Sequence, residues 1–133
     1  MFPGYVRSTA DAVGYLDDWV RSMGGVRVSG INAVPVDGGG LLIDQFQVEF
    51  AGAYELTVSM VLTAGLSATR YSFNLQQADE LVWRHDNHPG HEPQHGGPTH
   101  QHLGPSQNRR VSHMPVSLIE VAELIHQTLR SRG

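Results

Sequence analysis

The segment from Leu42 to Leu62, LIDQFQVEFAGAYELTVSMVL, decides the fold because apolar and polar residues alternate in two successive runs. A period of two residues is typical of a β-strand with one buried face. Between the runs stands Ala51-Gly52-Ala53, which is suited to a tight turn. The expected buried residues are Leu42, Phe46, Val48 and Phe50 in the first run and Tyr54, Leu56, Val58, Met60 and Leu62 in the second. The segment therefore predicts an antiparallel hairpin.

Two further runs extend this hairpin into a meander. In the third run the expected core residues are Tyr71, Phe73 and Leu75, and the polar residues between them are Arg70, Ser72, Asn74 and Gln76. The fourth run covers Glu80 to Asp86. If Gln77-Ala78-Asp79 forms the connecting loop, Ser72 faces Arg84 and Arg70 faces Asp86. This register places Arg70, Arg84 and Asp86 together on one polar face.

Amphipathic helices are predicted on either side of these strands. From Ser8 to Met23, apolar residues recur at steps of three and four, and Gly24-Gly25 forms a typical helix end. A second apolar stripe starts at the Ser-x-x-Glu capping box of Ser117 and Glu120 and continues to about Leu129. The valine-rich segment from Val26 to Val36 also contains glycine and proline, which confine any strand there to a sheet edge.

Together these elements predict an α+β fold in a single domain spanning residues 1–133. We expect a curved antiparallel sheet of four strands in meander order, with a fifth strand as an alternative. One N-terminal and one C-terminal helix cover one face of this sheet, and a long histidine-rich loop follows the last strand. The other face then carries Arg70 and Arg84.

Composition narrows the class of protein. The chain has no cysteine, so a metal site would need His, Asp or Glu ligands. No apolar run approaches the roughly 20 residues of a membrane span, and the N-terminus lacks the apolar core of a secretory signal, so we expect a cytoplasmic protein. The net charge of -4 argues against a surface that is basic throughout. All nine basic residues are arginines, whose planar fork suits phosphate or carboxylate.

The chemistry-bearing stretch is Leu81 to Leu103, LVWRHDNHPGHEPQHGGPTHQHL, which contains six of the eight histidines. Imidazoles titrate near neutral pH and serve in proton transfer and in metal ligation. After Asn87 the composition changes to His, Pro, Gly and Gln, and we expect a long loop through about Pro105. Such a loop either has a function or is a mobile surface loop without one, and composition alone leaves both interpretations open.

A spaced motif in this part of the chain resembles a known family. The motif reads Tyr71-Ser72-x-x-x-Gln76, then Leu81-x-x-Arg84-x-Asp86-Asn87-x-Pro89-x-His91, then Pro98-x-His100-x-His102. It resembles the TumE-like toxins of bacterial and archaeal toxin–antitoxin modules, which are small α+β proteins, and the likeness extends over roughly residues 41–129. The resemblance implies a cognate antitoxin as partner. The chain departs from the family pattern at His85, usually aromatic, at His88, usually Ala, and at Gly90 and Thr99, where the family has the first histidine of a pair.

The residues favour one reaction, cleavage of RNA by attack of the 2′-hydroxyl on the adjacent phosphate. This reaction needs a base, an acid and a cation near the developing charge. We expect His91 and His102 to supply the base and the acid, and Arg84 or Arg70 to supply the cation. Asp86 is expected to orient a histidine or an arginine. The expected substrate-binding residues are Arg70, Asn87 and His100.

Two other functions remain open from the residues alone. His91, His100 and His102 are an alternative ligand set for zinc or another divalent metal in a hydrolase, although the favoured reaction needs no cofactor. A non-catalytic binding module is the other alternative, in which a sheet face or edge engages a partner protein. RNA binding and a homodimer are further expectations, whereas a membrane partner is not expected. His126, Arg109 and Arg110 are interpreted as surface residues.

Overall fold

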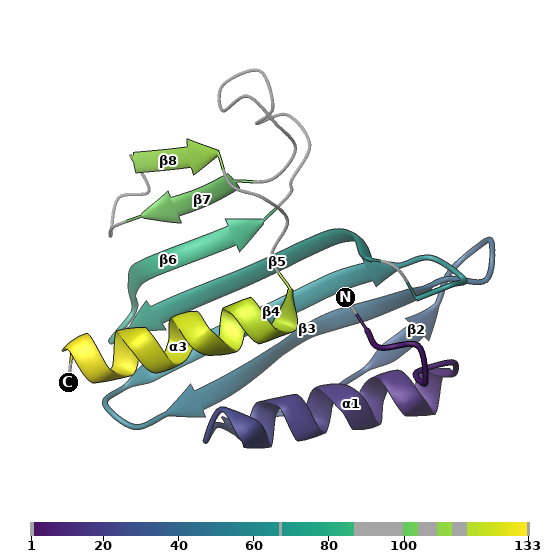
Figure 1. The fold of residues 1–133 in the computed structure, drawn as a ribbon, viewed down its shortest axis with the longest axis horizontal. Coiled ribbons are helices and arrows are strands. Elements are labelled where there is room, and N and C mark those ends of the chain that lie inside the picture. Colours follow the sequence, from purple (N-terminus) through teal and green to yellow (C-terminus); the bar gives the residue numbers. More distant parts are fainter. Residues whose placement is uncertain (1, 67, 87–99, 104–108, 113–116, 133) are drawn as a thin grey trace.

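The computed structural model describes residues 2–66, 68–86, 100–103, 109–112 and 117–132 (Figure 1). Helix α1 covers Thr9–Ser22 and helix α3 covers Leu118–Arg132. The strands are β1 Val26–Arg27, β2 Ala33–Pro35, β3 Leu41–Phe50, β4 Tyr54–Leu62, β5 Ala68–Gln77, β6 Glu80–Asp86, β7 His100–Leu103 and β8 Arg109–Ser112. None of the described helices is both long and apolar enough to cross a membrane.

The strands form one antiparallel sheet in the order β1-β3-β4-β5-β6-β7-β8, and β2 also pairs with β3. The meander from β3 to β6 follows the predicted runs, and the two helices stand at the predicted ends of the chain, so the α+β class is confirmed. Strands β1 and β2 occupy the valine-rich segment from Val26 to Val36 and are short edge pieces, as its glycine and proline predicted.

The sheet is wider than four or five strands because the histidine-rich segment contributes to it. We expected a continuous loop from Asn87 to about Pro105, and this was wrong for residues 100–103, which pair with β6 as strand β7. Strand β8 then pairs with β7. Both segments are short and polar, so their composition did not predict strands. They form strands because they pair with neighbouring strands of the sheet.

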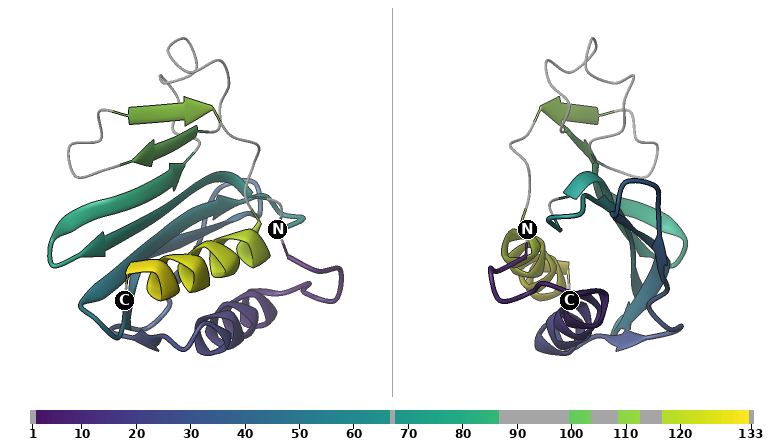
Figure 2. Two further views of the ribbon diagram at one scale, coloured as in Figure 1. Left: turned by 60° about the vertical axis from the view of Figure 1, so that its left-hand side comes forward. Right: turned by 90° about the vertical axis from the view of Figure 1, so that its right-hand side faces the viewer.

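Both helices lie on the same side of the curved sheet, as the right-hand view of Figure 2 shows. The core between the helices and the sheet includes Leu16 of α1, Phe46 of β3 and Ile125 of α3, all fully buried. Two tryptophans add hydrogen bonds to this packing. Trp19 Nε1 of α1 donates to the Leu118 carbonyl oxygen of α3 at 2.8 Å and joins the two helices. Trp83 Nε1 of β6 donates to Thr128 Oγ1 of α3 at 3.3 Å and joins the sheet to a helix. The other side of the sheet carries no helix among the described residues.

The helix ends match the sequence signals. Ser8 caps α1 by accepting a hydrogen bond from the Asp11 amide, and Gly24 follows the helix with a φ of +77°. In α3, Ser117 Oγ accepts from the Glu120 amide at 3.2 Å and lies 3.4 Å from Glu120 Oε1, which confirms the capping interaction. These interactions satisfy backbone groups that a helix terminus leaves without intrahelical partners.

One residue of the first predicted strand faces the other way. We placed Leu42 in the core with Phe46 and Val48, but an irregularity in the pairing of β3 with β4 between Ile43 and Phe46 changes the alternation. Leu41 and Ile43 are therefore buried, and Leu42 is only half-buried on the helix-free face. A β-bulge of this kind is set by strand pairing, so periodicity along one strand does not reveal it.

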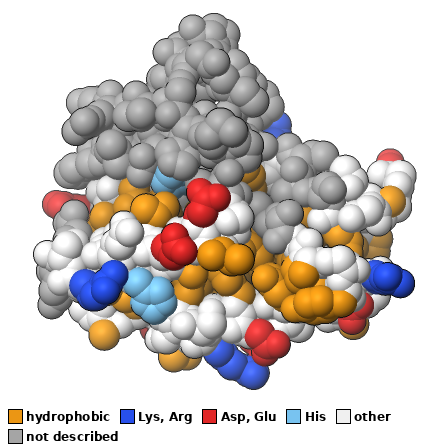
Figure 3. Space-filling view, viewed as in Figure 1, with side chains coloured by type: hydrophobic (Ala, Val, Ile, Leu, Met, Phe, Trp, Pro, Cys, Tyr) orange, Lys and Arg blue, Asp and Glu red, His pale blue; other side chains and the backbone are white. Residues whose placement is uncertain are grey.

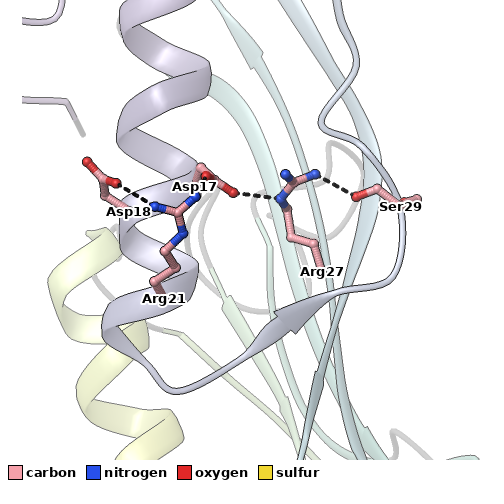
Figure 4. Close-up of polar contacts among 5 residues, drawn as sticks. All are labelled: Asp17, Asp18, Arg21, Arg27 and Ser29. Atoms are coloured by element: carbon pink, nitrogen blue, oxygen red, sulfur yellow. Dashed lines mark hydrogen bonds and ion pairs between the residues drawn. The ribbon is translucent and has the colours of Figure 1, made fainter.

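On the helix side, the exposed Arg21 and Arg130 stand among a larger number of acidic side chains. Helix α1 contributes Asp17 and Asp18, and α3 contributes Glu120 and Glu123. Figure 3 views this side, and its coloured side chains show acidic groups among hydrophobic ones without a continuous basic surface. Asp17 also binds two of the arginines: Arg21 Nη2 at 2.6 Å and Arg27 Nε of β1 at 2.8 Å (Figure 4). The Arg27 contact therefore joins β1 to α1, whereas the Arg21 contact lies within α1.

Candidate functional site

The helix-free face carries a pocket over strands β3 to β6. Its volume is about 480 Å³. The polar side chains that line it are Ser59, Arg70, Ser72, Arg84 and Asp86. The three charged members are the residues for which a shared polar face was predicted. Their grouping is confirmed, while their roles in binding or catalysis stay predictions.

The register that produces this grouping differs from the predicted one. Asn74 pairs with Arg84 and Ser72 with Asp86, whereas we expected Ser72 opposite Arg84. The turn contains only Ala78 and Asp79, both with positive φ, and a further irregularity lies between Leu75 and Gln76. Together they displace the pairing by two residues. Because side chains alternate with a period of two, this displacement leaves the face of every residue unchanged.

Arg84 and Asp86 form an ion pair within the site. They are two residues apart on β6 and so share a face, and Arg84 Nε lies 2.8 Å from Asp86 Oδ2. The Asp86 side chain is 5% exposed and that of Arg84 is 25% exposed, so the carboxylate is the more deeply placed partner. Arg70 is exposed at the rim of the same pocket. A guanidinium held in this way offers a fixed cationic group to an anion.

Strand β7 brings two of the candidate histidines into register with this pair. His102 is the backbone partner of Arg84, and His100 is the backbone partner of Asp86. Residues directly opposite one another in an antiparallel ladder belong to the same face of the sheet. The two histidine positions therefore adjoin the two charged positions, although His100 follows Asp86 by 14 positions and His102 follows Arg84 by 18.

His85 belongs to the core and not to this site. Its side chain is 1% exposed, and its ring lies 5.4 Å from that of Trp83 in an edge-on arrangement. Being between Arg84 and Asp86 in sequence, it points to the opposite face of the sheet. His85 therefore lies with Trp83 on the core side of the sheet. A buried ring here also fits the family pattern, in which an aromatic residue occupies this position.

The remaining candidates lie outside the described residues. These are Asn87 and His91, so neither their predicted roles nor the alternative metal site of His91, His100 and His102 is tested by the geometry. Where side chains are described, no three His, Asp or Glu residues form a metal-binding group.

Ser59 and Ser72 line the pocket and had not been proposed as site residues. They are cross-strand partners on β4 and β5, and Ser72 in turn pairs with Asp86. Ser72 does stand in the family motif, directly after Tyr71, and that was the available signal. For Ser59 the only signal was its place on the polar side of its strand.

The fold and the pocket define a small α+β protein with a charged site on the open face of its sheet. The model of the family described as Toxin TumE matches residues 16–132, and because this is most of the chain, the protein belongs to that toxin family. No curated protein and no solved structure matches the chain.

Membership assigns the protein to the toxins of toxin–antitoxin modules and implies a cognate antitoxin as its partner. The resemblance drawn from the motif of Tyr71 to His102 is therefore confirmed at the level of the family. The match begins within α1 and ends in α3, so it includes the second half of α1, the strands of the site and α3.

Proposed function

We propose that this toxin is a ribonuclease that cleaves RNA at the pocket on the helix-free face. The observation that carries the proposal is the adjacency of four positions: Arg84 and Asp86 on β6, with His102 and His100 as their backbone partners on β7. Cations and imidazoles are the groups that cleavage by an internal 2′-hydroxyl requires.

The reaction is a transfer of the phosphoryl group within the RNA chain. A base removes the proton from the 2′-hydroxyl, whose oxygen forms a bond to phosphorus. The bond from phosphorus to the 5′-oxygen breaks, and an acid donates a proton to that oxygen. The products are a 2′,3′-cyclic phosphate and a 5′-hydroxyl end, so this step consumes neither water nor a cofactor.

Each candidate residue has a role in this scheme. Arg84 binds the non-bridging phosphate oxygens as negative charge develops on them, and Asp86 positions its guanidinium. His102 and His91 exchange protons with the 2′-oxygen and the 5′-oxygen. Arg70, Asn87 and His100 hold neighbouring parts of the substrate.

The test uses the purified protein, without a histidine tag, and a single-stranded RNA oligonucleotide. A matched oligonucleotide has 2′-deoxyribose throughout. We expect cleavage of the RNA only, with 2′,3′-cyclic phosphate ends and the same rate in the presence of EDTA. Cleavage of both oligonucleotides would contradict attack by the 2′-hydroxyl. Loss of activity in EDTA, with recovery on adding zinc or manganese, would favour the metal-dependent alternative.

A further inference from the structure

A row of polar positions crosses the helix-free face from β4 to β8. By backbone pairing it runs through Thr57, Asn74, Arg84, His102 and Arg110. Neighbouring strands are about 4.8 Å apart. Arg84 and Arg110 are separated by one strand, so their backbones lie about 10 Å apart across the sheet, with His102 between them. The histidine proposed as a proton-transfer group thus stands between two arginine positions.

The neighbouring row of paired positions differs from this one in its charged residues. It runs through Ser59, Ser72, Asp86, His100 and Ser112 and contains no arginine. Of the two rows that include the proposed reactive residues, only the first therefore has cations on both sides of a histidine. A chain of phosphates that follows the cations would cross the strands along the first row.

Arg109 provides an internal comparison. It pairs with Leu103, which pairs with Trp83, and the Trp83 side chain is 5% exposed on the core side. Arg109 therefore belongs to a row of the helix-facing side, and Arg110 to the row of Arg84. Two arginines that are adjacent in sequence and equal in charge thus occupy register positions on opposite faces of the sheet.

We propose that Arg110 is a second phosphate-binding residue, an inference that rests on the proposed ribonuclease function. The substrate is single-stranded RNA that binds along the row of Arg84, His102 and Arg110. Its phosphates are held on either side of His102. The side chains described on this face, including Thr57, Ser72 and Asn74, offer no aromatic ring for base stacking along the row. Binding is therefore dominated by phosphate contacts and has little dependence on base sequence.

The experiment measures binding apart from cleavage. A single-stranded 2′-O-methyl RNA lacks the 2′-hydroxyl nucleophile, and its affinity is measured for the wild-type chain, Arg110→Ala and Arg109→Ala over a range of NaCl concentrations. Each phosphate contact to a single strand contributes about 0.7 to the slope of log affinity against log salt. We expect Arg110→Ala to reduce the slope by about 0.7 and Arg109→Ala to leave it unchanged. Arg110→Lys should restore the slope because it keeps the charge.

The outcomes separate this inference from the proposed function. Equal losses in Arg109→Ala and Arg110→Ala would overturn the inference, as would an Arg110→Ala slope equal to that of the wild type, even if the protein cleaves RNA. A loss specific to Arg110 in a protein that binds but does not cleave would support the inference and contradict the ribonuclease. Thermal unfolding of each variant shows that it is folded, and Arg110→Gln replaces Arg110→Ala if the latter does not fold.

Discussion

Asp86 Oδ2 lies 2.8 Å from Arg84 Nε, within a single strand and on the helix-free face of the sheet. The carboxylate is almost fully buried while the guanidinium is partly exposed, so the acidic partner lies beneath the basic one. An exposed pair of this kind contributes little to stability, but burial makes the loss of one partner costly. This geometry distinguishes the pair from a solvated ion pair on the sheet surface.

Removing the buried carboxylate is expected to destabilise the protein. Asp86→Ala should lower the free energy of unfolding by about 2 kcal/mol, because a partly buried guanidinium loses its charged partner. Asp86→Asn should cost less, since the amide oxygen still accepts a hydrogen bond. Urea denaturation measures both values. Glu123→Ala on the exposed helix face is the control, with an expected change within about 0.5 kcal/mol. An equal effect of Asp86→Ala and Glu123→Ala would show that the ion pair does not contribute to the free energy of unfolding.

Replacing the cation of the pocket is expected to affect both cleavage and folding, because it removes the guanidinium that pairs with the buried Asp86 carboxylate. Cleavage rates are therefore compared at a temperature where thermal unfolding shows that each variant is folded. Arg84→Ala should reduce the rate of RNA cleavage by about 10²- to 10³-fold, because a preorganised group that stabilises transition-state charge is lost. Arg84→Lys keeps the charge without the planar fork and should recover only part of the rate. The measurement is single-turnover cleavage with protein in excess. Full activity in Arg84→Lys would show that charge alone matters.

The proposed acid and base are tested by the double substitution His91→Ala, His102→Ala. Loss of one general acid or base typically costs 10²- to 10⁴-fold, so RNA cleavage and growth arrest should both disappear. The control is His126→Ala, at an exposed position on the far side of the molecule in α3. Unchanged growth arrest in the double variant would refute the assignment of this pair.

The contact between α1 and β1 is tested on the helix side. Asp17 binds both Arg21 and Arg27, so Asp17→Asn should lower the free energy of unfolding by about 1 kcal/mol. Asp18 lies 3.8 Å from Arg21 and is 80% exposed, and Asp18→Asn should have almost no effect. Thermal unfolding compares the two variants, which remove the same charge from adjacent positions. A larger effect of Asp18→Asn would contradict the importance of the Asp17 contacts.

Parts of the site were predictable because side chains along a strand alternate between the two faces of the sheet. The positions of Arg70, Arg84 and Asp86 on one face were correct even though the register was displaced by two. A displacement of one would have separated Asp86 from Arg70. The correct face thus depended on two local irregularities, the shorter turn and the bulge, whose effects on alternation cancelled.

The sequence by itself determined the two helices, the meander from β3 to β6 and the membership of the TumE toxin family. Caps, period and motif spacing are properties of neighbouring residues, and they act whatever the rest of the chain does. Only the tertiary structure decided that residues 100–103 pair with β6 and that residues 109–112 extend the sheet further. Residues 100–103 form a strand because the edge of β6 supplies hydrogen-bond partners, and residues 109–112 pair in turn with residues 100–103. Such pairing leaves no periodic signal in a short polar segment.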